Sequence, residues 1–251
     1  MNSVESKRDK LLAQWEPMSA SLGSYDAVVQ AGLVKFNSDN VISRIWAGDH
    51  TVWKPDPAEI TNRLGWLHIA EAMREHLGRI EDLSASVRRE GYTHALLLGM
   101  GGSSLAPEVF SRTYGAKEGF LELDVLDSTD PDTVLGHAGR LDLRKTLFIV
   151  STKSGSTIEP LSFFKYFYNR VLDVVGPDEA GRHFIAITDP ESHLLEIAEQ
   201  YRFRHAFVND PNIGGRYSVL SYFGLVPAAL IGIDLGALRD RAQIAGGNAG
   251  G

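Results

Sequence analysis

Residues 146–157 read Thr146-Leu147-Phe148-Ile149-Val150-Ser151-Thr152-Lys153-Ser154-Gly155-Ser156-Thr157. An apolar run rich in β-branched and aromatic residues, a small polar loop and a long apolar-periodic segment predict a strand, a tight turn and a helix. The loop offers five hydroxyls, one ammonium group and one glycine at the start of that helix. Unpaired N–H groups and the positive end of the helix dipole favour anions there, and hydroxyl donors suit phosphate oxygens. The stretch indicates a phosphate site, with ordinary turn and capping chemistry as the alternative.

The same alternation of strand and helix continues on both sides of this stretch. Further apolar runs occur at 94–98, 123–127, 183–188 and 205–208, and helical patterns occur at about 104–114, at 157–175 and after Asp189-Pro190-Glu191-Ser192. The runs are continuous, which indicates strands buried on both faces and hence a parallel sheet covered by helices. We therefore predict an α/β fold, with a three-layer α/β/α domain and a five-stranded parallel sheet over residues 91–235. Ligands of such sheets bind beyond the carboxyl ends of the strands, where the loops should converge.

The two ends of the chain differ from this central region. Residues 1–90 are predicted to be a helical N-terminal segment that packs on the core. Asp56-Pro57-Ala58-Glu59 has the pattern of a helix start, and apolar residues from Ile60 to Val87 predict one long amphipathic helix stopped by Gly91. Residues 236–251 form a glycine-rich tail, which we expect not to support a packed element and interpret as a truncation point.

Composition limits the classes of partner. The 251-residue chain has a formal net charge of −7 and no basic block, so we expect neither nucleic acid nor a membrane as a partner. It contains no cysteine, which excludes disulfides, thiolate zinc sites and cysteine catalysis. Residues 1–15 lack the apolar core of a signal peptide, and no run reaches the roughly 18 apolar residues of a membrane span. These features predict a cytoplasmic protein.

Two further loops follow predicted strands. In Gly99-Met100-Gly101-Gly102-Ser103-Ser104, the glycines would let backbone N–H groups approach a ligand oxygen, and Ser103 adds a hydroxyl. A dinucleotide-binding loop would need glycine in place of Ser104, although Asp127 after the second strand keeps a nicotinamide enzyme as an alternative. In residues 212–221, two glycines precede Arg216, whose guanidinium can stabilise a developing oxyanion. An ordinary surface arginine is the alternative there.

Other candidate chemistry has less support. The eight histidines show no spacing typical of a metal site, so we expect no metal and no other cofactor. Glu159 and Asp189 have the positions of helix-start residues rather than of general bases.

Taken together, the three loops resemble the glucose-6-phosphate isomerase family. Residues 99–107 are similar to its first sugar-isomerase loop, residues 152–160 to its phosphate loop, and residues 214–221 with 224–230 to the signature that carries its arginine. The resemblance covers about residues 47–234, in matching order and spacing. Residues 44–47 and the helix expected after Asp56 resemble the isomerase part of bacterial fusions with transaldolase.

The resemblance implies an enzyme of glycolysis and gluconeogenesis that interconverts glucose 6-phosphate and fructose 6-phosphate through an enediolate. The implied phosphate ligands are Thr152, Ser154 and Thr157, with Lys153 beside them. The implied sugar contacts are Gly102 and Ser103, with Gly215 beside the reacting carbons. The implied catalytic residue is Arg216, which would stabilise the enediolate.

One part of the family pattern is missing from the sequence. In the family a catalytic glutamate, a ring-opening histidine and a late lysine follow the arginine signature, and no residue after Arg216 matches them. We therefore expect the chain to be the N-terminal half of the enzyme, without the catalytic base. The alternative is a non-catalytic phosphosugar-binding module of the sugar-isomerase type. The expected partner is a small phosphosugar, and a homodimer is an open alternative to a monomer.

Overall fold

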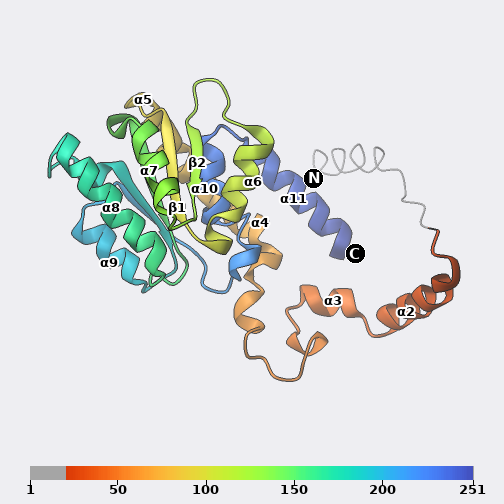
Figure 1. Cartoon of the computed structure of the whole chain (residues 1–251). Helices are drawn as coiled ribbons and strands as arrows, with labels where there is room; N and C mark the ends of the chain where they lie inside the picture. The colour runs from red at the N-terminus through yellow and green to blue at the C-terminus, as the bar shows by residue number, and fades with distance from the viewer. Residues whose placement is uncertain (1–20, 251) are drawn as a thin grey trace. The chain divides into compact units, whose positions relative to one another are not determined.

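Five strands lie side by side in the order β2-β1-β3-β4-β5, and every neighbouring pair is parallel. The computed structural model describes residues 21–250 and is drawn in Figure 1. The strands are β1 (His94–Gly99), β2 (Glu122–Leu126), β3 (Thr146–Ser151), β4 (Phe184–Thr188) and β5 (His205–Val208). The predicted five-stranded parallel sheet is confirmed, and β5 has the predicted bounds.

Helices cover both faces of the sheet. Successive side chains of a strand point to opposite faces, so apolar residues on both faces need to be buried. In β1, Ala95 and Leu97 belong to one hydrophobic core, and Leu96 and Leu98 belong to the other. The first core is completed by α5 (Leu77–Arg89), α6 (Leu105–Tyr114) and α10 (Tyr222–Leu230). The second core is completed by α7 (Pro131–Arg140), α8 (Ile158–Val175) and α9 (His193–Gln200). The three-layer arrangement is confirmed.

Two of these helices are additions to the sequence-based picture. The side chain of Asp130 accepts a hydrogen bond from the Thr133 N–H at 2.9 Å, and Pro131 follows it, so α7 begins with an N-cap and a proline at N1. Every residue of α10 is buried. A helix enclosed on all sides is apolar all round and shows no amphipathic period, which explains why its sequence reads only as an apolar segment.

The long helix predicted after Asp56 is wrong over its first half. The chain instead forms short 3₁₀ segments (Thr61–Arg63, Gly65–His68, Met73–His76) around α4 (Ile69–Ala72) before α5 begins at Leu77. Glu59 has a left-handed backbone with φ of 61°, and Leu64 forms an antiparallel bridge with Ile213. The positive φ at Glu59 interrupts a continuous helix, and the bridge at Leu64 satisfies backbone groups through a tertiary contact instead. The expected stop at Gly91 is correct, because its φ is 88° and the Tyr92 N–H closes on the Val87 carbonyl at 3.1 Å.

The glycine-rich end also differs from the prediction. Helix α11 runs from Leu235 to Gly250 through the segment that we expected to lack structure. The side chain of Asp234 accepts a hydrogen bond from the Ala237 N–H at 2.9 Å and so satisfies one of the first N–H groups of α11. Glycine weakens a helix by about 1 kcal/mol per residue relative to alanine without forbidding it.

The chain divides into two units, of which residues 58–240 contain the sheet. The other unit contains the residues up to Pro57 and those from Arg241 onward. In it, α2 (Asp26–Ser38) is followed by α3 (Val41–Trp46), with short 3₁₀ segments at Gly23–Tyr25 and His50–Val52. The inference about a signal peptide concerns residues 1–15, which lie outside the described residues. Between residues 21 and 250, no helix is both long and apolar enough to cross a membrane.

Candidate functional site

The ends of β1 and β3 bring two of the predicted loops together. Gly99 pairs with Ser151 at the last register position of these neighbouring strands. The Ser151 hydroxyl donates to the Ser103 carbonyl at 3.2 Å, and so joins the loop after β1 to the loop after β3. Because parallel strands end at the same edge of the sheet, residues 52 positions apart in the chain become neighbours there.

The third loop meets the first through a close backbone approach. A Cβ atom placed on Gly102 would lie 2.3 Å from the Gly215 carbonyl oxygen, a distance that no real side chain tolerates. The Ser218 hydroxyl lies within hydrogen-bonding distance of both backbones, 3.2 Å from the Gly102 carbonyl and 2.7 Å from that of Gly215. Glycine at position 102 is therefore a steric requirement of the contact between the two loops.

A pocket of about 440 Å³ opens between the three loops. Its lining residues are Arg63, Met100, Gly102, Ser103, Ser151, Thr152, Lys153, Ser154, Thr157, Pro160, Asp189 and Gly215. All the residues that we expected to bind substrate are among them. The expected catalytic residue, Arg216, is not.

The loop after β3 presents its polar groups at the start of α8. The Thr152 hydroxyl donates to the Thr157 hydroxyl at 3.2 Å, and the hydroxyls of Ser154 and Ser156 lie 2.9 Å apart. Thr157 is the N-cap of α8, and its side chain makes no capping hydrogen bond to the helix. The first N–H groups of an 18-residue helix are thus left without this side-chain acceptor, close to a cluster of hydroxyls. This arrangement can bind an anionic oxygen.

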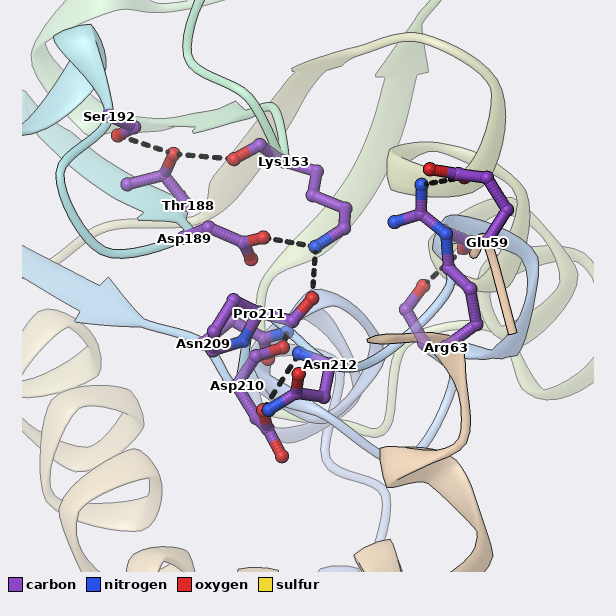
Figure 2. A network of polar contacts seen from close by, with 12 residues as sticks. Glu59, Arg63, Lys153, Thr188, Asp189, Ser192, Asn209, Asp210, Pro211 and Asn212 are labelled. Carbon is purple, nitrogen blue, oxygen red and sulfur yellow. Dashed lines mark hydrogen bonds and ion pairs between the residues drawn. The ribbon is translucent and has the colours of Figure 1, made fainter. Parts of the chain in front are cut away.

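Lys153 is held on the other side of this loop by an ion pair with Asp189. Its ammonium group also donates to the Pro211 carbonyl at 2.8 Å, and its carbonyl accepts from the Asp189 N–H at 3.1 Å. Figure 2 shows the ammonium group between the Asp189 carboxylate and Pro211. Burial raises the pKa of Asp189, against the opposing influence of the Lys153 charge. The second carboxylate oxygen of Asp189 is buried and has no hydrogen-bond partner among residues 21–250.

This geometry corrects the interpretation of Asp189 as a helix-start residue. Helix α9 begins at His193, with Ser192 as its N-cap, so Asp189 stands outside the helix at the end of β4. Strands β3 and β4 are parallel neighbours, and this is what places Asp189 beside Lys153. Glu159 does lie in the first turn of α8, as expected.

Comparison with known proteins matches this chain to one family. Residues 68–239 match the family model described as phosphoglucose isomerase. That match covers the sheet and the loops that line most of the pocket. The chain belongs to the phosphoglucose isomerase family.

Relatives of the phosphoglucose isomerase family are similar over most of this chain. A glucose-6-phosphate isomerase of Rubrobacter xylanophilus is 29% identical over 217 residues, which are 84% of this chain and 48% of that protein. A glucose-6-phosphate isomerase of Thermus thermophilus is 33% identical over 178 residues, 70% of this chain and 41% of that protein. Among solved structures, a hypothetical protein of Thermus thermophilus superposes with a TM-score of 0.75 at 30% identity, covering 88% of this chain and 50% of that one. The chain thus spans about half the length of the relatives it matches.

Arg216, the expected catalytic residue, lies outside the pocket lining. It is exposed on the short 3₁₀ segment Gly215–Tyr217, directly after the glycine that contacts Gly102. Within the described part of the chain, its guanidinium makes no hydrogen bond or ion pair. It is therefore adjacent to the pocket and unrestrained by neighbouring side chains.

Several pocket residues of this family member were missed by sequence reasoning. Met100, Ser151 and Pro160 lie within the quoted loops, so their proximity to the predicted ligands was the only available signal. Arg63 had no such signal, because it lies in a segment that the sequence predicts to be helix.

In residues 21–250, no group of three or more histidine, aspartate or glutamate side chains could hold a metal ion.

Proposed function

We propose that the pocket binds a phosphorylated sugar, and that residues 58–240 form the phosphate-binding part of an enzyme that interconverts glucose 6-phosphate and fructose 6-phosphate. The observation that carries this proposal is the joining of three family loops around one pocket, with the hydroxyl-rich loop at the start of α8. A volume of about 440 Å³ lies within the ordinary range for small-molecule pockets. Membership of the phosphoglucose isomerase family supports the choice of an aldose–ketose isomerase.

The phosphate end of the ligand belongs at the loop after β3. Thr152, Ser154 and Thr157 supply hydroxyl donors, and the start of α8 supplies N–H groups and the positive end of its dipole. Lys153 adds positive charge, but the ion pair with Asp189 partly neutralises it. A ligand phosphate therefore competes with Asp189 for the ammonium group, which moderates the affinity that Lys153 contributes.

The sugar end of the ligand belongs toward Gly102, Ser103 and Gly215. In the isomerisation, a base removes the proton from C2 and delivers it to C1, while a proton moves from the C2 hydroxyl oxygen to the C1 carbonyl oxygen. The intermediate carries negative charge on oxygen, which a guanidinium can stabilise. We assign this role to Arg216, because its side chain is free beside Gly215 within the described residues.

The base is proposed to come from outside residues 1–251. Among the described residues that line the pocket, Asp189 is the one carboxylate, and it is engaged with Lys153. We therefore propose that this chain alone binds phosphosugar and turns it over slowly, since a well-placed base contributes about 10²- to 10⁴-fold. We further propose a cytoplasmic location, a homodimer, and domain limits at residues 1–90, 91–235 and 236–251. Sedimentation of the purified chain tests the homodimer.

Binding is tested by calorimetry on residues 1–251. Glucose 6-phosphate and 6-phosphogluconate should bind, and unphosphorylated glucose should not. Lys153→Ala combined with Thr157→Ala should weaken the binding of 6-phosphogluconate. The matched control is Ser162→Ala with Lys165→Ala, because both residues are exposed on α8 away from the pocket lining. Equal affinities for the two double variants would place the phosphate elsewhere.

Turnover is tested by a coupled assay. Residues 1–251 should show little activity, and fusion to the C-terminal half of a full-length relative should restore it. In that fusion, Arg216→Ala should lower kcat more than it raises KM. Robust turnover by residues 1–251 would refute the missing base, and Glu159→Gln and Asp189→Asn would then show which carboxylate serves.

A further inference from the structure

We infer that Arg63 is a second ligand-binding cation of this pocket, which recognises an acidic group at the end of the sugar away from the phosphate. This inference rests on the proposed phosphosugar site. Arg63 lines the same pocket as Lys153. In Figure 2 it comes from a different part of the chain and lies apart from the Lys153–Asp189 pair. The family match begins at residue 68, so Arg63 lies just before it.

Three contacts attach the segment of Arg63 to the third loop. Leu64 forms an antiparallel bridge with Ile213, and the Gly65 N–H donates to the Asn212 carbonyl at 2.9 Å. The ring of Trp66 stacks on that of Tyr217, with centroids 5.2 Å apart and planes 16° apart. Because the residues directly after Arg63 are attached in this way, its backbone is fixed relative to Gly214 and Gly215.

The side chain of Arg63 is directed by its immediate neighbours. A Cβ on Gly214 would lie 3.6 Å from the Arg63 Cδ, so the aliphatic part of Arg63 passes over that glycine. The guanidinium donates to the Glu59 carboxylate at 2.6 Å, and Glu59 is held in a left-handed backbone conformation with φ of 61°. The Arg63 side chain is 37% exposed, so it is neither buried nor free in solvent.

The chemistry of this arrangement favours a flat anion. A guanidinium has five N–H donors in a planar fork, so one bond to Glu59 leaves donors for a ligand. That fork matches a carboxylate, or the neighbouring oxygens of an enediolate, better than it matches a hydroxyl. With the phosphate anchored at the loop after β3, Arg63 would distinguish a phosphosugar acid from the corresponding phosphorylated polyol.

The test compares two ligands that differ at one end. Calorimetry on residues 1–251 measures the binding of 6-phosphogluconate, which carries a C1 carboxylate, and of glucitol 6-phosphate, which carries a C1 hydroxyl. We expect Arg63→Gln to weaken 6-phosphogluconate about tenfold to a hundredfold, the effect of losing hydrogen bonds to a charged group, and to leave glucitol 6-phosphate nearly unchanged. Lys153→Ala should weaken both ligands.

Two further variants separate binding from folding. Arg112→Gln is the matched control, because Arg112 forms an i,i+4 ion pair with Glu108 as Arg63 does with Glu59, and lies outside the pocket lining. It should change neither affinity. Glu59→Gln keeps Arg63 and removes the competing carboxylate, so it should strengthen 6-phosphogluconate several-fold. Circular dichroism and a thermal melt establish that each variant is folded.

The outcomes distinguish this inference from the proposal beneath it. If the natural chain binds both ligands and Arg63→Gln weakens both equally, or neither, then Arg63 does not recognise the acidic end, while the phosphosugar site stands. A fall in 6-phosphogluconate affinity on Glu59→Gln also overturns the inference, because Arg63 would then need Glu59 rather than compete with it. If the natural chain binds neither ligand, both the inference and the proposed function fail.

Discussion

Gly102 and Gly215, which are 113 positions apart in the sequence, both line the pocket and lie so close that a Cβ atom on Gly102 would be 2.3 Å from the Gly215 carbonyl oxygen. The first loop follows β1 and the third loop follows β5, so both leave the same parallel sheet at the carboxyl ends of its strands. This contact fixes the spacing of the two glycine-containing loops. The shape of the pocket that both loops line therefore depends on it.

Substitution at this contact should therefore affect both folding and binding. Gly102→Ala would place a methyl group 2.3 Å from the Gly215 carbonyl oxygen, so the third loop must shift. We expect a loss of about 1–3 kcal/mol in the free energy of unfolding, as for overpacked sites, together with weaker phosphosugar binding. Urea denaturation and calorimetry measure the two effects. Gly136→Ala in α7, where a Cβ meets nothing within 4 Å, is the control and should not destabilise.

Removal of the charge on Asp189 should release Lys153. Burial raises the pKa of Asp189, so the folded chain stabilises its carboxylate less than water does. A carboxyl group whose pKa is raised by folding stabilises the folded chain below its ordinary pKa, which is 3.8 for aspartate. This stabilisation is lost as the pH rises through the folded pKa. At neutral pH, Asp189→Asn should therefore cost little stability and should strengthen the binding of inorganic phosphate several-fold. Asp173→Asn, at an exposed position of α8, is the comparison, and weaker phosphate binding by Asp189→Asn alone would show that Asp189 instead positions Lys153.

The pH dependence of stability should reflect three histidines. Burial lowers the pKa values of His137, His183 and His205 from the ordinary 6.5. On acidification, these histidines therefore bind protons at a higher pH in the unfolded chain than in the folded chain. Their contribution to the free energy of unfolding is fully present above pH 6.5 and is lost as the pH falls toward the folded pKa values. Urea unfolding at pH 7.5 and pH 5.5 tests this. His205 faces the Arg79 guanidinium at 2.7 Å, so His205→Gln should reduce the loss, and an unchanged loss would exclude His205 as a contributor.

A second, more acidic transition should come from Glu90. Two hydrogen bonds from Arg204, at 2.7 and 2.6 Å, lower the pKa of Glu90 from 4.5 to about 2. This stability is present above pH 4.5 and is lost as the pH falls toward 2. Glu90→Gln at pH 7 should cost about 1–2 kcal/mol, after allowance for solvent screening of a carboxylate that is 35% exposed. Glu108→Gln, equally exposed and paired with Arg112, should cost less than about 0.5 kcal/mol in the same urea titration.

Much of this fold could be predicted from local sequence. The three central strands, β1, β3 and β4, are nearly continuous apolar runs, and the loops after β1 and β3 carry glycines and hydroxyls at the positions where a strand must turn into a helix. Both signals depend on neighbouring residues, because burial on two faces and positive φ angles restrict which side chains are allowed. The hydroxyls and the ammonium group of the loop after β3 likewise pointed to Thr152, Lys153 and Thr157, and all three line one pocket.

The sequence by itself determined the individual strands and the hydroxyl-rich loop after β3, because each is encoded within a dozen consecutive residues, and the alternation of such strands with helices indicated a parallel sheet. Only the tertiary structure decided the ion pair of Lys153 with Asp189, the position of Arg63 in the pocket lining and the break of the helix predicted after Asp56. The bridge from Leu64 to Ile213 provides the physical reason. Backbone groups in that segment are satisfied by a partner about 150 residues away in the chain, and no local pattern specifies such a partner.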